Sequence, residues 1–525
     1  MTALAAAAAV GAALLGAPAA QAAPAPGYQP PAVVWGKCAG ASLAGAGAQC
    51  GFVTVPLDYA NPGGEKIKIA VSRIKHKVPD AKAQGPMLVN PGGPGGSGLA
   101  LAALGQAVPN HAGDAYDWIG FDPRGVGSSR PALSCIPTYG GFDRPEYDPA
   151  KAPNVAATWL AKASKYAAAC ATRGGNLLNH LTTADAAKDM DSIRKALGAK
   201  QINYYGFSYG TYLGQVYATL FPQNLRRVVF DGVVDPRGVW YQDNLGQDVA
   251  FQKTIEIYFD WVAKHDATYH LGNTGQAVEK LYYSEQDKLR AHPAGGQIGP
   301  SEWTDIFLQA GYYVFGWADT TAMFSDWVHH QNLAELKAAF EHAGSVSDDN
   351  GYAIYLSVQC TDTQWPRSVP GILADNTRVA RTAPFETWGN AWYNAPCSYW
   401  KAPAAVPVQV SGRGVPPILM VNETFDAATP YSGALETRRV FPGSVLIEGV
   451  GGTTHAGSLS GVACTDNTIA AYLATGALPT RVAGNRSDKR CDPVPPPPPI
   501  PPVASPTPAG AGSSAATTKA RAQVA

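Results

Sequence analysis

The stretch Gly206-Phe207-Ser208-Tyr209-Gly210 decides the fold of this chain. It is the only G-x-S-x-G pattern in the sequence. It follows a β-prone run, 201–205, and precedes a helix-like segment, 211–220, that stops near Pro222. A strand, a sharp turn and a helix around such a serine are typical of a nucleophile elbow. Side chains in place of the two glycines would collide with the neighbouring strand and helix. The pattern therefore predicts an exposed, reactive Ser208.

The composition indicates a loop-rich, exported protein. The chain has 525 residues, of which 46% are hydrophobic and 15% charged, with 56 Gly and 43 Pro. Lys plus Arg and Asp plus Glu number 40 each, so no net charge attracts nucleic acid or an anionic membrane. Neither partner is expected.

The N-terminus predicts a signal peptide over residues 1–22. Residues 3–20 are apolar and rich in alanine, and Ala20-Gln21-Ala22 before Ala23 fits a cleavage site. A membrane anchor is the alternative, disfavoured by the weak hydrophobicity of alanine and by Pro18. No Lys or Arg precedes the run, which leaves open a start upstream of Met1.

Eight cysteines in an exported chain predict four disulfides. None lies in C-x-x-C and no Cys/His group has zinc spacing, so no metal is expected. Short loops favour the pairs Cys38–Cys50 and Cys464–Cys491, which leaves Cys135–Cys170 and Cys360–Cys397 as the local remainder.

The pattern along the chain predicts an α/β core with a helical insertion. Short buried strands alternate with helical segments over residues 36–235 and again over 416–491. This alternation argues for a mostly parallel sheet with helices on both faces. Residues 236–415 are helix-like and rich in aromatics, which predicts a cap inserted into the core. Residues 492–525 form a Pro-rich tail, expected to be extended and then disordered.

A reactive serine needs a general base, and the base needs an orienting acid. Around a nucleophile elbow the chain order is Ser, then Asp or Glu, then His. Asp426 follows the strand-like run 417–421, and His455 lies in a glycine-rich loop after the next strand. Both positions are strand carboxyl ends, where an open α/β sheet places its site. We therefore predict the triad Ser208, His455 and Asp426, with Glu423 as the reserve acid.

The glycine-rich loop Asn90-Pro91-Gly92-Gly93-Pro94-Gly95-Gly96-Ser97-Gly98 follows the strand-like run 87–89. Backbone N–H groups approach a substrate closely only where side chains are absent. The loop therefore predicts an oxyanion hole, with the N–H groups of Gly93 and Tyr209 as donors. A nucleotide-binding loop is the alternative, because G-x-G-x-x-G also occurs here. That match is weak in so glycine-dense a loop, Walker spacing is absent, and no cofactor is expected.

Five ordered motifs carry a family resemblance. They are Pro91 to Gly95, Gly120 to Ser129, Gly206 to Gly214, Asp231 to Pro236, and Asp426 to Pro430. Together they resemble the secreted tripeptidyl aminopeptidases of actinomycetes, in the prolyl aminopeptidase group of α/β-hydrolases. The resemblance implies an α/β-hydrolase fold. It also implies serine-dependent release of short peptides from free N-termini, with proline at the cleaved position in some members.

One departure from the resemblance concerns the glycine loop. It reads Asn90-Pro91-Gly92-Gly93 where prolyl aminopeptidases typically carry His-Gly-Gly, which weakens the expectation that single residues are released. Asp122 and Arg124, which follow a predicted strand, are interpreted as structural.

An exopeptidase must also bind the ammonium group of its substrate, which requires a carboxylate at a distance from Ser208. The candidates are Glu302, Asp305, Asp319, Asp326 and Glu423. Six aromatics of the insertion could line a proline pocket, although their helical spacing favours the core of the insertion for most of them: Tyr312, Tyr313, Phe315, Trp317, Phe324 and Trp327.

The sequence therefore predicts a monomeric, extracellular serine exopeptidase that acts on peptide or protein N-termini, with the tail as a candidate attachment to the cell wall. A carboxylesterase or lipase with the same triad is the alternative. A non-catalytic wall-binding protein with a Pro-rich stalk is a third, less favoured hypothesis, and an Asp nucleophile is disfavoured by Ser208. Activity is expected to fall on the acid side of about pH 6 to 7, where His455 becomes protonated.

Overall fold

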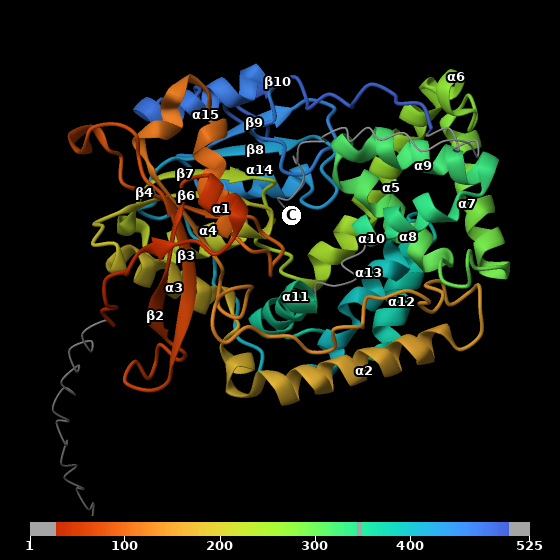
Figure 1. Ribbon diagram of the computed structural model, residues 1–525, viewed down its shortest axis with the longest axis horizontal. Coiled ribbons are helices and arrows are strands. Elements are labelled where there is room, and N and C mark those ends of the chain that lie inside the picture. Colours follow the sequence, from red (N-terminus) through yellow and green to blue (C-terminus); the bar gives the residue numbers. More distant parts are fainter. Residues whose placement is uncertain (1–27, 344–348, 503–525) are drawn as a thin grey trace, which may run out of the picture.

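The computed structural model describes residues 28–343 and 349–502; the predicted signal peptide and the end of the predicted tail lie outside them. One half of the molecule is built on a ten-stranded sheet and the other half is helical (Figure 1). The strands are β1 (Gly36–Lys37), β2 (Gln49–Pro56), β3 (Lys66–Ile74), β4 (Pro86–Asn90), β5 (Asp117–Phe121), β6 (Ile202–Phe207), β7 (Leu225–Asp231), β8 (Ile418–Glu423), β9 (Val445–Gly449) and β10 (Lys489–Cys491).

The strand order is β1-β2-β3-β5-β4-β6-β7-β8-β9-β10. Pairing is antiparallel from β1 to β5 and parallel from β5 to β10. Strands β6 and β8 are buried at every residue, as expected for parallel strands covered on both faces. The predicted α/β-hydrolase fold with a mostly parallel sheet is therefore confirmed.

Helices cover both faces of the sheet and bury two hydrophobic clusters against it. One face packs against α3 (Thr183–Ala196), α4 (Tyr209–Leu220) and α14 (Tyr431–Val440). The opposite face packs against the 3-10 helices η2 (Leu99–Ala107) and η3 (Pro109–Ala115) and against α15 (Ala463–Thr475). The remaining short helices are α1 (Ala41–Gly45), η1 (Asp80–Lys82), η4 (Gly175–His180) and η5 (Pro222–Asn224).

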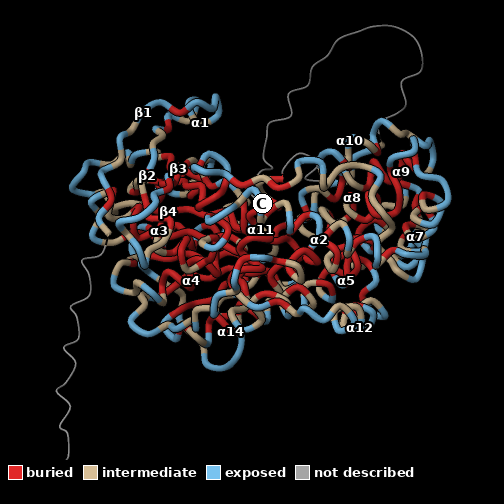
Figure 2. Tube along the Cα trace, turned by 90° about the horizontal axis from the view of Figure 1, so that it is seen from below, coloured by how far each residue is buried: buried red, intermediate tan, exposed pale blue. Residues whose placement is uncertain are grey.

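The helical half, here called the cap, lies between β7 and β8 in the sequence. Its helices are α5 (Tyr241–Lys264), α6 (Asp266–Tyr269), α7 (Gly275–Ala291), α8 (Pro300–Tyr312), η6 (Val314–Gly316), α9 (Trp317–His330), α10 (Leu333–Ala343), α11 (Asp349–Asp362), α12 (Val369–Ala380), α13 (Thr387–Asn394) and η7 (Ala395–Tyr399). Apolar faces of α5 to α10 enclose an aromatic-rich core of their own, whereas α11 and η7 join the hydrophobic cluster of the sheet half. Buried segments run through both halves of the molecule (Figure 2).

A segment ahead of Ser208 also packs on the cap, although the sequence pattern assigned it to the core. Helix α2 (Val155–Gly174) lies along α13, with the ring of Trp159 6.4 Å from that of Trp392 and stacked on it. Burial of these large rings decides the placement of α2, because each aromatic side chain removes a large apolar area from water.

The Pro-rich segment after β10 docks on the rest of the molecule, a contact that its composition does not predict. Its first part, residues 492–502, is extended and crosses from the sheet to the cap (Figure 1). Val494 is buried there, and the N–H of Ile500 donates to Tyr269 Oη at 3.0 Å. A polyproline chain loses little entropy on docking, so a few contacts are enough to hold it.

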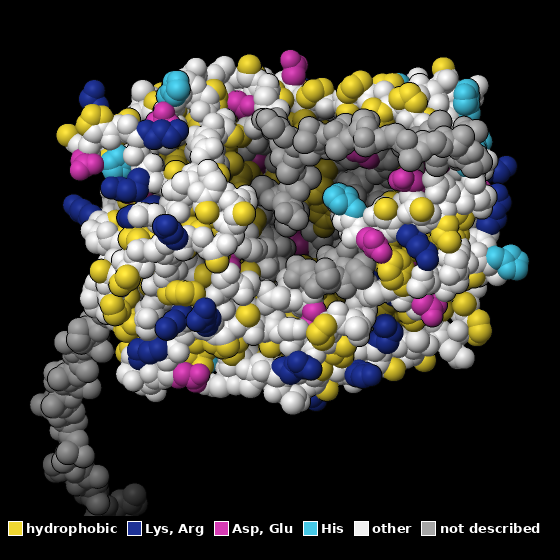
Figure 3. Space-filling view, viewed as in Figure 1, with side chains coloured by type: hydrophobic (Ala, Val, Ile, Leu, Met, Phe, Trp, Pro, Cys, Tyr) yellow, Lys and Arg dark blue, Asp and Glu magenta, His cyan; other side chains and the backbone are white. Residues whose placement is uncertain are grey.

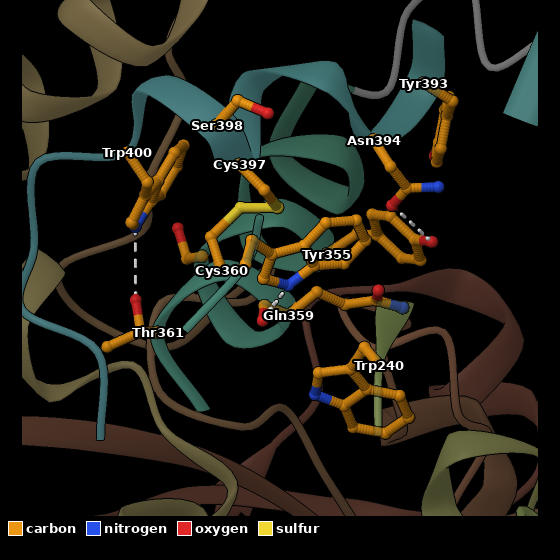
Figure 4. The surroundings of a disulfide bond; sticks show 12 residues. Trp240, Tyr355, Gln359, Cys360, Thr361, Tyr393, Asn394, Cys397, Ser398 and Trp400 are labelled. Atoms are coloured by element: carbon orange, nitrogen blue, oxygen red, sulfur yellow. Dashed lines mark hydrogen bonds between the residues drawn. A yellow bond between two sulfur atoms is a disulfide. The ribbon is translucent and has the colours of Figure 1, made fainter. Parts of the chain in front are cut away.

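All four predicted disulfides are present: Cys38–Cys50, Cys135–Cys170, Cys360–Cys397 and Cys464–Cys491. The third joins α11 to η7, with the side chains of Tyr355, Gln359 and Trp240 nearby (Figure 4). Within the described ranges, no helix combines the length and apolar character needed to cross a bilayer.

Candidate active site

Ser208 stands at the turn between β6 and α4, at the carboxyl edge of the sheet. Its backbone has φ 54° and ψ −128°, a strained conformation for a residue with a side chain. A Cβ added at Gly206 would lie 2.5 Å from the carbonyl oxygen of Gly210, and one at Gly210 would lie 2.8 Å from that of Asn90. The close packing requires both glycines, and the strand–turn–helix context expected around Ser208 is present.

The structure brings Asp426 and His455 together at the same edge of the sheet. Nδ1 of His455 is 3.0 Å from Oδ1 and 2.9 Å from Oδ2 of Asp426. Thr429 also donates to the carboxylate, through its N–H (2.9 Å) and its Oγ1 (2.8 Å). Asp426 and His455 are 1% and 3% exposed. The carboxylate is therefore held by three donors and fixes the imidazole through Nδ1.

The electrostatics of this pair suit a general base. Burial lowers the pKa of His455, but the neighbouring carboxylates of Asp426 and Asp231 outweigh it, so that the pKa is raised above 6.5. Nε2 of His455 has no hydrogen-bond partner among the described residues, and His455 borders the cavity that Ser208 also lines. The described residues show no hydrogen bond between Nε2 and Ser208 Oγ, and such contacts often tighten only when substrate binds.

Gly232, just after β7, gives the imidazole its room. A Cβ at this position would lie 2.8 Å from Cε1 and 3.1 Å from Nδ1 of His455, and the residue has φ +67°. Both the space and the backbone conformation therefore require glycine here.

The glycine-rich loop after β4 lies against the elbow. A Cβ at Gly92 would be 2.7 Å from Ser208 Cβ and 3.1 Å from the Tyr209 nitrogen, while the N–H of Gly92 donates to Asn90 Oδ1 at 3.0 Å. Gly93 and Tyr209 border the cavity, and the N–H of Tyr209 is the first of α4, where no intrahelical acceptor exists. Since the N–H of Gly92 is already engaged, Gly93 stays the preferred loop donor.

A cavity of about 620 Å³ lies between the sheet and the cap, above Ser208. The molecular surface is hollowed between the two halves (Figure 3). Five acidic residues border the cavity: Asp235, Asp243, Asp305, Asp349 and Glu386. Among the described residues, only Glu386 and Asp243 of these five have a buried oxygen without a hydrogen-bond partner, Oε2 and Oδ2 respectively.

The ammonium-binding candidates from the sequence lie in different places. Only Asp305 borders the cavity, and it is paired with Arg144 and accepts from Tyr147 Oη at 3.0 Å. The others are engaged or remote. Glu302 caps α8, Asp319 is exposed, Asp326 bonds His330 and Asn332, and Glu423 accepts two main-chain N–H groups behind the histidine loop.

Two of the six aromatic candidates, Tyr312 and Tyr313, border the cavity. Phe315 is exposed, and the remaining three pack in the core of the cap: Trp317, Phe324 and Trp327.

Sequence reasoning missed Thr429, Asp243 and Glu386. Thr429 had a local signal, because an Asp followed three residues later by Thr is a common side-chain-to-backbone turn. Asp243 and Glu386 had none, since each is an ordinary acid in a helical segment. Only the meeting of distant segments makes them cavity residues.

Two known protein families match this chain. Residues 85–289 match the family described as the alpha/beta hydrolase fold, and residues 383–491 match the family described as TAP-like protein. Together with the parallel sheet, these matches define a serine hydrolase of the α/β-hydrolase class.

Similar proteins of known name identify the family within this class. Over 82% of its length the chain is 44% identical to the tripeptidyl aminopeptidase of Streptomyces coelicolor, covering 82% of that protein. It is 31% identical to the serine protease Hip1 and to carboxylesterase B, both of Mycobacterium tuberculosis, covering 86% and 85% of them. The chain therefore belongs to the tripeptidyl aminopeptidase family of serine peptidases.

Proposed function

We propose that this protein is an exported serine exopeptidase that releases tripeptides from free N-termini by acyl transfer. The observation that carries the proposal is the fixed imidazole: Nδ1 of His455 is held by Asp426, Nε2 is left without a partner among the described residues, and His455 and Ser208 border the same cavity. In this orientation His455 exchanges protons only on the side where a substrate would lie.

In the first half-reaction, Ser208 Oγ attacks the scissile carbonyl carbon and passes its proton to Nε2 of His455. The N–H groups of Gly93 and Tyr209 donate to the oxyanion. The intermediate collapses as the C–N bond breaks, and the leaving amine takes the proton from His455. Water then gives a proton to His455 and attacks the acyl carbon. The peptide leaves as a carboxylic acid, and Ser208 recovers its proton.

An exopeptidase also needs an acid for the substrate ammonium, and we assign this role to Glu386. Its side chain lies at the start of α13, is largely buried, and has an unpartnered Oε2 at the cavity. Burial and the nearby carboxylates of Asp305 and Asp248 raise the pKa of Glu386 well above its usual value. A bound ammonium group would supply the missing donor and favour the ionised form.

Asp243 competes for the same role. It also has an unpartnered oxygen at the cavity, and burial raises the pKa of Asp243 to about 8. The residue Asp243 is half-buried whereas Glu386 is buried, although Oδ2 of Asp243 is itself out of contact with water. The rest of the Asp243 side chain is therefore less desolvated than that of Glu386. This difference favours Glu386 as the group that needs a substrate cation.

The test compares chromogenic di-, tri- and tetrapeptide anilides with free and acetylated N-termini. We expect the free tripeptide substrate to be preferred, and acetylation to lower kcat/KM by about 10- to 100-fold, the value of one charge-assisted hydrogen bond. Glu386→Gln should erase the difference between free and acetylated substrates, while Asp243→Asn, the matched control, should keep it. Equal cleavage of both substrates by the unmodified protein would contradict the exopeptidase assignment.

A carboxylesterase is the second candidate, because one relative at 31% identity carries that name and the same three residues can cleave esters. An esterase should hydrolyse an uncharged ester such as p-nitrophenyl butyrate with a higher kcat/KM than any free tripeptide anilide. The exopeptidase proposal predicts the opposite order.

Export is proposed from the N-terminal pattern and from the four disulfides, which form in oxidising compartments. Protein recovered from the culture medium should begin at Ala23. A preference for proline at the cleaved position is also proposed, with Tyr312 and Tyr313 as its cavity walls. Mass spectrometry of products from a library of free peptides would show whether proline is enriched at that position.

A further inference from the structure

Glu423 links three segments that meet behind the active site. It is the last residue of β8, three residues before Asp426, and is 5% exposed. Its Oε2 accepts from the N–H of Thr454 and its Oε1 from the N–H of Val494, each at 2.7 Å. Thr454 directly precedes His455, and Val494 follows the last strand. One carboxylate therefore joins the strand of the aspartate, the loop of the histidine and the C-terminal segment.

Two glycines of the histidine loop leave the space that this contact needs. A Cβ at Gly452 would collide with Oε2 of Glu423 and lie 2.5 Å from Cβ of Pro493. A Cβ at Gly457 would lie 2.9 Å from Cγ2 of Val494. The loop that carries His455 thus packs on Glu423 and on the C-terminal segment without side chains of its own at these two points.

Residues 492–502, here called the strap, are anchored at both ends. At the start, β10 pairs with β9, and the disulfide Cys464–Cys491 ties β10 to α15. In the middle, the side chain of Val494 packs in the hydrophobic cluster that contains cap residues together with Ala427 and Ala428 of the aspartate loop. Near the end, the N–H of Ile500 donates to Tyr269 Oη in the cap (Figure 1).

We propose that the strap is part of the catalytic apparatus. Through Val494 and Glu423 it keeps the loop of His455 in its place beside Asp426. Val494 and Glu423 are therefore positioning residues for the reaction. The strap supports the loop from behind, while Tyr312 of the cap supports it from the front by accepting the N–H of His455 at 2.8 Å. The inference rests on the proposed role of His455 as the base.

Removal of the strap leaves the buried Glu423 with one donor fewer and opens the space beside Gly457. A buried polar oxygen without a partner is costly, so Glu423 and the histidine loop are expected to rearrange. Displacement of a catalytic group by about 1 Å lowers the rate by about 100-fold. The effect should appear in kcat rather than in KM, because the strap does not border the cavity.

The first experiment compares the full chain with chains that end at residue 502 and at residue 492. Both truncations keep Cys491 and its disulfide. The chain ending at 502 should match the full chain. The chain ending at 492 should lose about 10- to 100-fold in kcat with little change in KM, and its Ser208 should react with a fluorophosphonate more slowly by a similar factor.

A pair of point variants separates positioning from stability. Val494→Pro removes the N–H donor within a polyproline context. Val278→Ala, in α7 and away from the histidine loop and the cavity, removes apolar atoms from the same buried cluster. We expect kcat and the fluorophosphonate rate to fall in Val494→Pro and to stay near the full-chain values in Val278→Ala, although Val278→Ala lowers Tm as well. Equal kcat in the two folded variants would overturn the proposal.

The rate of labelling by a fluorophosphonate separates a failure of the proposed function from a failure of the role of the strap. Labelling requires a reactive Ser208 and its base but no particular peptide, and Ser208→Ala provides the blank. An unmodified chain that is not labelled at Ser208 would refute the proposed function. Labelling of the chain ending at 492 as fast as the full chain would refute the role of the strap alone.

Discussion

The main-chain N–H of His455 donates to the carbonyl oxygen of Tyr312, 2.8 Å away, so that the end of α8 in the cap holds the loop of the histidine. The N–H of Val314 reinforces this link by donating to Thr454 Oγ1 at 3.3 Å. The rings of Tyr312 and Tyr313 have their centroids 5.9 Å and 6.2 Å from the imidazole. The cap therefore forms a wall of the cavity and also supports the proposed base. Its position and the position of His455 are coupled.

Gly232→Ala should displace the imidazole. The added Cβ would lie within 3.1 Å of two ring atoms of His455, at a backbone φ of +67° that alanine rarely adopts. We expect kcat to fall by about 100-fold, as for other misplaced catalytic groups, with a smaller change in KM. Gly45→Ala is the matched control, because a Cβ there meets no atom within 4 Å. Peptidase kinetics of the two variants check the prediction, and a Gly232→Ala enzyme of normal kcat would contradict it.

The acid limb of the pH–rate profile should lie above pH 6.5. The base must be neutral, and the carboxylates of Asp426 and Asp231 raise the pKa of His455, so activity is lost as pH falls through that raised pKa. Asp426→Asn removes the stronger of these charges. It should move the limb to lower pH and reduce kcat by about 10⁴-fold, because the amide favours the wrong tautomer of the imidazole. Profiles of kcat/KM from pH 4 to pH 9 measure both effects; an unmoved limb would exclude His455 as the titrating base.

Much of this site follows from local patterns. Ser208, Asp426 and His455 are found because each follows a strand, and parallel strands deliver their carboxyl ends to one edge of the sheet. The disulfides follow from short loops, and β2 and β3 from their alternating side chains. These features depend on neighbours in the sequence.

The features that the sequence does not reveal depend on packing between distant segments. Glu386 becomes a cavity acid only because α13 packs against Tyr147, which precedes Ser208 in the chain and donates to Asp305 of α8. Composition predicts an extended conformation for residues 492–502, but it does not specify the surface on which they dock. Glu423 resembles a reserve acid by position, yet its two oxygens are occupied by Thr454 and Val494.

Loss of the Cys360–Cys397 disulfide should weaken both stability and substrate binding. The bond closes a separation of 37 residues, so the double Ser variant is expected to lose about 4 kcal/mol of unfolding free energy. Tyr355 and Gln359, on the helix that carries Cys360, border the cavity, and KM should therefore rise. The matched control replaces Cys38 and Cys50, a separation of 12 residues, for an expected loss of about 3 kcal/mol. Denaturant unfolding and KM measure the two effects, and an equal KM in both variants would contradict the link to the cavity.

The pair of Arg124 and Asp189 should support the fold and not the chemistry. Arg124 donates through Nε to Oδ2 and through Nη2 to Oδ1 of Asp189, both at 2.7 Å, and the two side chains are 2% and 1% exposed. Asp189→Asn leaves the buried guanidinium without its main counter-charge, which should cost about 3–5 kcal/mol of unfolding free energy.

The folded Asp189→Asn enzyme should retain its kcat, because neither residue borders the cavity. Asp80→Asn is the control, since that carboxylate is 97% exposed beside His76 and should leave Tm unchanged. Thermal unfolding and kcat at 25 °C are measured together. A fall in kcat without a fall in Tm would assign Arg124 to the site, because only a group that acts on the reaction alters the rate of a chain that remains fully folded.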